Sequence, residues 1–168
     1  VNTVKLDIEE WIAQIAEWRQ KWPIESEQKV DGIHPNRFLR DLSTSSQDVG
    51  AWVVDVGQHQ MWAAQSIWID RGQRFLTSGG HGAMGFALPA AIGAALAMRG
   101  SGDSRNVVAI IGDGGFQVNV AALHTIRQLN LPIKIVVMNN HGHGMVRQFQ
   151  QEVFDGRIVS TDFDPPVF

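Results

Sequence analysis

Two short apolar runs constrain the fold of this 168-residue chain more than any other feature. They cover residues 107–111 and 133–138, and both are rich in β-branched residues, which favour strands. Residues 116–129, between them, have the pattern of a helix. A strand, a helix and a second strand of these lengths form a βαβ unit, whose strands are parallel. We therefore predict an α/β fold with a mostly parallel sheet and helices on both faces.

Three other segments extend this fold. Residues 51–56 form an apolar run that leads into Gly57, which predicts another buried strand. Residues 35–42 predict a short helix, because proline suits the first turn of a helix. Residues 82–98 are rich in alanine, and we predict a buried helix there whose small side chains let a second subunit pack closely.

The N-terminal segment differs from the rest of the chain. Between residues 7 and 20, apolar side chains recur at spacings of three and four, which predicts an amphipathic helix docked on the domain. The first residue is not methionine, and the last residues follow a proline pair, so we expect the chain to be a piece of a longer protein. We divide it into an N-terminal linker helix region, residues 1–30, and one domain, residues 31–168.

Composition excludes several classes of partner. The 14 Lys and Arg residues against 17 Asp and Glu residues give a net charge of −3, and without a basic cluster we expect no nucleic-acid partner. The long uncharged stretch at residues 83–98 is shorter than the ~20 residues of a spanning helix, so we expect no membrane partner. The absence of cysteine suits a reducing compartment, and we expect a cytoplasmic protein. Charged residues, at 18%, fall below the ~25% usual in globular proteins, so part of the exterior should be covered in an assembly.

The strongest functional signal is the turn Gly112-Asp113-Gly114-Gly115, which follows the strand predicted at residues 107–111. Glycines there let the backbone approach a phosphate group at the start of a helix. Asn139 and Asn140 directly follow the next strand, so Asp113 and Asn140 should lie close together at the carboxyl edge of the sheet. Carboxylate and amide oxygens suit Mg²⁺. Helix capping is the simpler alternative for Asp113.

A second glycine-rich segment predicts a different function. The run Gly80-His81-Gly82-Ala83-Met84-Gly85 matches the dinucleotide pattern GxGxxG, which would indicate a nucleotide-dependent oxidoreductase. That site requires a strand before the glycines and an acidic residue at the end of the next strand. Here the preceding strand would cover only residues 74–77, and Asp103 comes before a strand rather than after one. The context therefore favours the Gly112–Gly115 turn as the phosphate site.

The motifs together resemble the signature of thiamine diphosphate enzymes, in which a Gly-Asp-Gly turn precedes an Asn pair by some two dozen residues. Here Gly112-Asp113-Gly114 is followed, after residues 115–138, by Asn139-Asn140. The further segments that are similar to the acetolactate synthase family are residues 55–62, 78–91 and 144–148. Over roughly residues 35–158, the chain resembles the C-terminal, diphosphate-binding domain of that family. The resemblance implies decarboxylation and carboligation of 2-oxo acids with thiamine diphosphate and Mg²⁺.

The resemblance also implies roles for individual residues. The implied metal ligands are Asp113, Asn140 and the backbone carbonyl of Gly142. The implied cofactor contacts are Gly57, Gln58, His59, Gly82, Met84, Gly114, Gly115, His143, Gly144 and Met145. Of these, Gly82 and Met84 would hold the aminopyrimidine ring, Met145 would line the site, and the others would contact the diphosphate.

The resemblance implies that no catalytic residue lies in this chain. The family's essential glutamate belongs to the N-terminal domain of a partner subunit, and no glutamate here has such a context. The expected assembly is a homodimer or homotetramer, in which the protein's own N-terminal domains and a second subunit complete the site for a 2-oxo acid. The isolated domain should be inactive. A non-catalytic thiamine diphosphate-binding module is a further alternative.

Overall fold

A parallel sheet forms the centre of the computed structural model, which describes residues 7–23 and 32–164. The sheet has four strands in the order β2-β1-β3-β4, and every pairing is parallel. The strands are β1 (Val49–Val54), β2 (Arg74–Thr77), β3 (Asn106–Gly112) and β4 (Ile133–Met138). The predicted α/β class is confirmed.

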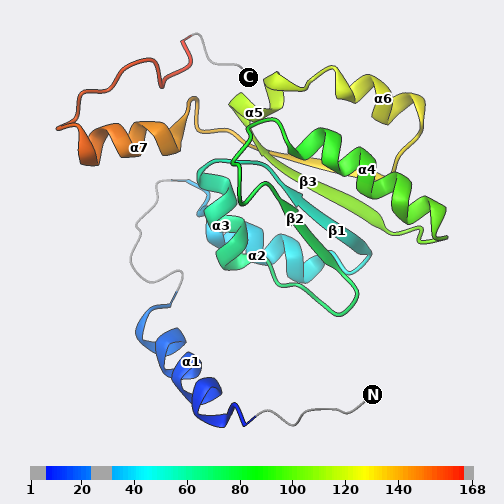
Figure 1. The fold of residues 1–168 in the computed structure, drawn as a ribbon, viewed down its shortest axis with the longest axis horizontal. Coiled ribbons are helices and arrows are strands. Elements are labelled where there is room, and N and C mark those ends of the chain that lie inside the picture. Colours follow the sequence, from blue (N-terminus) through cyan, green and yellow to red (C-terminus); the bar gives the residue numbers. More distant parts are fainter. Residues whose placement is uncertain (1–6, 24–31, 165–168) are drawn as a thin grey trace.

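Helices cover both faces of this sheet (Figure 1). On one face lie α4 (Ala87–Gly100), α5 (Asp113–Val118) and α6 (Ala122–Gln128). On the other face lie α2 (Pro35–Ser45) and α3 (Gln58–Ser66). Along β1, Ala51 and Val53 join the first core and Trp52 and Val54 the second, as the alternation of side chains in a strand requires. Burial on both faces explains why the two central strands, β1 and β3, are continuous apolar runs.

Two predicted helices have different bounds in the structure. The helix predicted at residues 116–129 is two helices, α5 and α6, separated by residues 119–121. The helix predicted at residues 82–98 begins only at Ala87, because Gly82 and Gly85 take positive φ angles of 71° and 83° in a loop before it. The predicted strand at 51–56 ends earlier, at Val54.

The helix predicted near the N-terminus is present as α1 (Glu9–Lys21), but its docking is not. None of its residues is buried, and Trp11 is 62% exposed. Trp11 and Trp18 contact each other edge to face, with ring centroids 6.1 Å apart. The predicted boundary between residues 30 and 31 lies outside the described residues. Within the described ranges, every helix is too short or too polar to cross a bilayer.

Candidate functional site

A pocket of about 230 Å³ lies at the carboxyl edge of the sheet. Residues that follow each of the four strands line it. Gly57 follows β1, Gly82 follows β2, Asp113 follows β3 and Asn140 follows β4. The paired ends Val54↔Ile110 and Gly112↔Met138 keep neighbouring strands in step, so these loops meet at one place. This edge is where open parallel sheets bind ligands.

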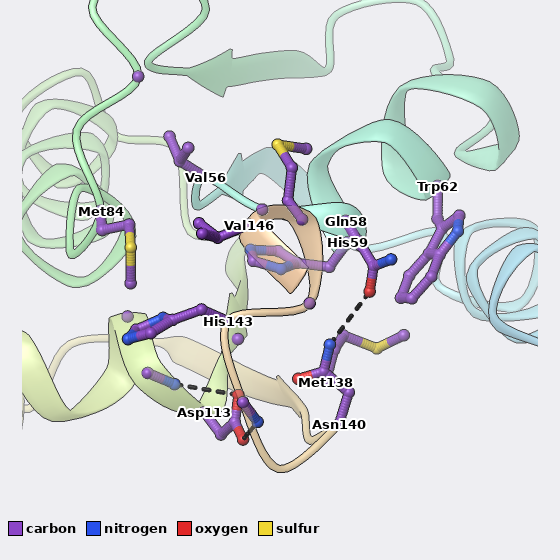
Figure 2. Close-up of a pocket in the computed structure, with 18 residues that line it drawn as sticks. Val56, Gln58, His59, Trp62, Met84, Asp113, Met138, Asn140, His143 and Val146 are labelled. Atoms are coloured by element: carbon purple, nitrogen blue, oxygen red, sulfur yellow. Dashed lines mark hydrogen bonds between the residues drawn. The ribbon is translucent and has the colours of Figure 1, made fainter. Parts of the chain in front are cut away.

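Asp113 ties the turn after β3 to the loop after β4. Its side chain is 2% exposed. Its Oδ1 accepts a hydrogen bond from its neighbour's backbone, Gly114 N, at 3.0 Å, and its Oδ2 accepts one from Gly142 N at 3.1 Å (Figure 2). The second bond crosses between two strand ends. Capping does not explain Asp113, because the N-cap of α5 is Gly112 and no side chain caps this helix.

A chain of side-chain amides lies on the other side of this loop. Asn140 Nδ2 donates to Gln58 Oε1 at 3.1 Å (Figure 2). Gln58 Nε2 in turn donates to Gln148 Oε1 at 3.2 Å. A Cβ at Gly144 would overlap the amide ends of Gln58 and Asn140, so a larger residue there would displace this pair. Because Gln58 engages the amide nitrogen of Asn140, the Asn140 Oδ1 is the atom available to a cation.

His59 lines the pocket and is almost entirely buried. Its side chain is 6% exposed, and its Nε2 is buried without a hydrogen-bond partner in the described structure. Burial lowers the pKa of His59 from 6.5 to about 4, although the Asp55 and Asp113 carboxylates act in the opposite direction. The imidazole is therefore neutral at pH 7.

The loop that carries Met84 is attached to the sheet by Asp55. Asp55 is fully buried at the end of β1, where its Oδ1 accepts from Gly85 N at 2.9 Å and its Oδ2 from Ala87 N at 2.8 Å. These bonds fix the start of α4 and hold Met84 beside the pocket. Figure 2 shows Met84 and His143 on the same side of it.

The C-terminal segment fixes the loop after β4, a feature that sequence reasoning missed. His143 N donates to Thr161 O at 2.7 Å, and Phe163 N donates to His141 O at 2.9 Å. The Phe163 ring contacts His143 edge to face, with centroids 4.8 Å apart. Asp162 forms an ion pair with Arg147 on α7 (Gly144–Val153). No motif in residues 157–164 indicates this role.

The structure places every predicted metal and cofactor residue around this pocket. They are Gly57, Gln58, His59, Gly82, Met84, Asp113, Gly114, Gly115, Asn140, Gly142, His143, Gly144 and Met145. The pocket has further lining residues to which the sequence analysis gave no contact: Val56, Trp62, Gly112, Met138 and Val146. All but Met138 lie within the motif segments, and Trp62 lies one helical turn from Gln58, so helical periodicity was the available signal for Trp62.

The pocket fits a diphosphate and its cation. A Cβ at Gly114 would lie only 3.0 Å from Phe163 and 3.1 Å from His143, so glycine keeps the turn open for a phosphate group. The described residues contain no cluster of three or more His, Cys, Asp or Glu that could hold a metal. The predicted set instead combines one carboxylate, one amide and one backbone carbonyl, which suits Mg²⁺ with phosphate and water completing its shell.

This fold and pocket define an α/β domain that binds a diphosphate-bearing cofactor at the carboxyl ends of parallel strands. The chain belongs to the family described as thiamine pyrophosphate enzyme, C-terminal TPP binding domain, which matches residues 55–168. The predicted family and the predicted cofactor, thiamine diphosphate, are thereby confirmed. Membership of this family favours a thiamine diphosphate site over a dinucleotide site as the role of the Gly80–Gly85 loop.

Known proteins agree with this assignment. The acetolactate synthase large subunit of Lactococcus lactis subsp. lactis (strain IL1403) is 38% identical over 164 residues, which are 98% of this chain and 28% of that protein. The acetolactate synthase isozyme 2 large subunit of Escherichia coli (strain K12) is 41% identical over 160 residues, 95% of this chain and 28% of that protein. The chain thus spans little more than a quarter of these relatives.

A solved structure supports the fold. The thiamine diphosphate-dependent 4-hydroxybenzoylformate decarboxylase of Rhodococcus jostii RHA1 superposes with a TM-score of 0.69 at 25% identity. The match covers 82% of this chain and 25% of that enzyme.

Proposed function

We propose that the full-length protein is a thiamine diphosphate enzyme of acetolactate-synthase type, which decarboxylates a 2-oxo acid and joins the remaining carbon unit to a second carbonyl compound. The observation that carries this proposal is the meeting of all four strand-end loops at one pocket. When bound, thiamine diphosphate supplies the nucleophilic carbon and the electron sink for this chemistry. The protein supplies binding, orientation and exclusion of water.

The carboxyl ends of β3 and β4 supply the metal and diphosphate side of the site. Asp113, Asn140 and the carbonyl of Gly142 bind Mg²⁺, which neutralises the diphosphate charge. His59 contacts the diphosphate from the first turn of α3, where backbone N–H groups suit an anion. Gly114 and Gly144 keep space for the ligand, because a side chain at either position would meet its neighbours.

The loop after β2 supplies the other side of the site. Gly82 and Met84 contact the aminopyrimidine ring, and Met84 stays 39% exposed in this chain, so one of its faces is open to that ring. Met145, from the start of α7, lines the same space.

The remainder of the site comes from elsewhere in the protein. No glutamate is among the residues that line the described pocket. A glutamate from the N-terminal domain of a second subunit completes it in a cytoplasmic homodimer or homotetramer. Exposed apolar residues beside the pocket, including Val146 and Phe149 on α7, provide surface for that contact. The domain itself comprises residues 31–168, with residues 1–30 as a linker.

The test is turnover of pyruvate by the full-length protein with thiamine diphosphate and Mg²⁺. Release of carbon dioxide with formation of acetolactate supports the proposal. Binding of the cofactor without any turnover of pyruvate or 2-oxobutyrate would overturn it and would favour a non-catalytic binding module.

A further inference from the structure

The side chain of Asn119 contacts the loop that carries Met84, far from it in sequence. Asn119 Nδ2 donates to the backbone carbonyl of Gly85 at 2.7 Å. Its own backbone carbonyl accepts from Ala122 N at 2.9 Å, so Asn119 ends α5 and leads into α6. The break between these helices therefore places one amide group directly against the loop.

Gly85 is held from both sides. Its N–H donates to the buried Asp55 Oδ1 at 2.9 Å, and its carbonyl accepts from Asn119 at 2.7 Å. Its φ is +83°, and a Cβ there would lie 2.7 Å from Val118 and 2.8 Å from Asn119. Only glycine satisfies this position, because it combines a positive φ with close contact.

The other end of the loop has its own attachment. Gly82 N donates to Ser78 O at 3.0 Å, and Ala83 N donates to Ser78 Oγ at 3.3 Å. Met84 lies between this attachment and the fixed Gly85 peptide. Its position at the pocket thus depends on the residues that hold Gly85.

Two of these residues belong to elements that also border the predicted diphosphate side. Asp55 directly follows β1 and lies two residues before Gly57, and a Cβ at Gly115 would lie 2.9 Å from Asp55 Oδ1. Asn119 directly follows α5, which begins at Asp113. The Met84 loop is therefore held by β1 and α5, the elements that also border Asp113. The side chains that hold it, Asp55 and Asn119, do not line the pocket.

We infer that Asn119 is a positioning residue, which together with Asp55 fixes the Met84 loop against the aminopyrimidine ring of the cofactor. The inference rests on the proposed function, because it uses the ring contacts assigned to Gly82 and Met84. The inference assigns the two halves of the cofactor to different residues. Asn119 governs recognition of the ring, whereas Asp113 and Asn140 govern recognition of the metal and diphosphate.

The test compares two ligands by titration calorimetry on the full-length protein in saturating Mg²⁺. Thiamine diphosphate contacts both sides of the site, whereas inorganic pyrophosphate can use only the diphosphate side. Loss of the hydrogen bond in Asn119→Ala should weaken thiamine diphosphate binding about fivefold to tenfold and leave pyrophosphate binding within about twofold. Asn119→Asp should weaken the cofactor at least as much, because a carboxylate then faces the Gly85 carbonyl.

Gln117→Ala is the matched control, because Gln117 is exposed on the same short helix and does not line the pocket. It should bind both ligands as the wild type does. Pyrophosphate binding also reports that each variant is folded. Amide hydrogen exchange gives a second readout, since residues 82–86 of Asn119→Ala should exchange faster than those of the wild type without ligand.

The outcomes are distinguishable. Selective loss of cofactor affinity supports the inference. Wild-type affinity for both ligands, or an equal loss for both, would overturn it while leaving the proposed function intact. Failure of the wild-type protein to bind thiamine diphosphate would overturn the proposed function itself.

Discussion

The side-chain amide of Asn140 donates a hydrogen bond to Gln58 Oε1 across 3.1 Å, joining the loop after β4 to the first turn of α3. Because the nitrogen of Asn140 is engaged, its oxygen is oriented toward the space next to Asp113. Gln58 thereby orients a predicted metal ligand in addition to its predicted contact with the diphosphate.

Gln58→Ala should raise the Mg²⁺ concentration needed for half-maximal cofactor binding by about fivefold, the effect of losing one hydrogen bond. Titration of Mg²⁺ at fixed thiamine diphosphate measures it. Gln148→Ala is the control, since it removes only the outer bond of the amide chain and keeps the Asn140 contact. An unchanged Mg²⁺ requirement in Gln58→Ala would contradict the orienting role.

Gly144→Ala should destabilise the domain by about 0.5–1 kcal/mol, because the added methyl group overlaps the amide ends of Gln58 and Asn140 and breaks their hydrogen bond. Urea unfolding monitored by tryptophan fluorescence gives the change. Gly93→Ala is the contrasting variant, since Gly93 lies in α4 with nothing within 4 Å of its added Cβ. It should stabilise the protein by about 0.5–1 kcal/mol. Equal effects of the two variants would count against the crowding argument.

Stability should fall between pH 6.5 and pH 4 because of His59. Burial lowers the pKa of His59 from 6.5 to about 4 in the folded protein. Within this range the unfolded chain binds a proton at His59 that the folded protein does not, so acidification favours unfolding. The contribution is about 3 kcal/mol, present above pH 6.5 and lost by pH 4.

Urea unfolding as a function of pH measures this effect. His59→Gln should lose less stability than the wild type over that range, whereas the exposed His81→Gln should follow the wild type. Identical pH profiles for wild type and His59→Gln would show that the loss of stability in acid arises from a group other than His59.

The sheet could be predicted from the sequence because the residue pattern within each main strand is enough to identify it. The β-branched runs at residues 107–111 and 133–138 became β3, which is buried, and β4, the half-buried edge strand, and continuous apolar runs of this kind indicate strands without knowledge of their partners. The ends of the helices could not be predicted from local pattern in this way. The start of α4 depends on Asp55, and the break at Asn119 coincides with its bond to Gly85, both of which are contacts between distant segments.

The site shows the same division. Its metal and cofactor candidates lie in motifs that directly follow strands, so topology alone brings them to one edge. Thr161 and Phe163 lie in no motif, and their hydrogen bonds to the loop after β4 exist only once the chain has folded back. The exposure of α1 was also unpredictable, because amphipathic periodicity indicates a face that can be buried and does not identify its partner.

The central claim is that Asp113 holds a cation that clamps the diphosphate of thiamine diphosphate. The most direct measurement is calorimetric binding of thiamine diphosphate to the full-length wild-type protein and to Asp113→Asn, each with Mg²⁺ and with a chelator. Asparagine keeps the size of the side chain but removes its charge, and its NH2 group replaces one of the two oxygens that accept bonds from Gly114 and Gly142. The comparison of the wild type with and without Mg²⁺ therefore isolates the effect of the metal. We predict tight binding only for the wild type with Mg²⁺. Equal affinity of wild type and variant, or equal affinity with and without Mg²⁺, would contradict the metal clamp.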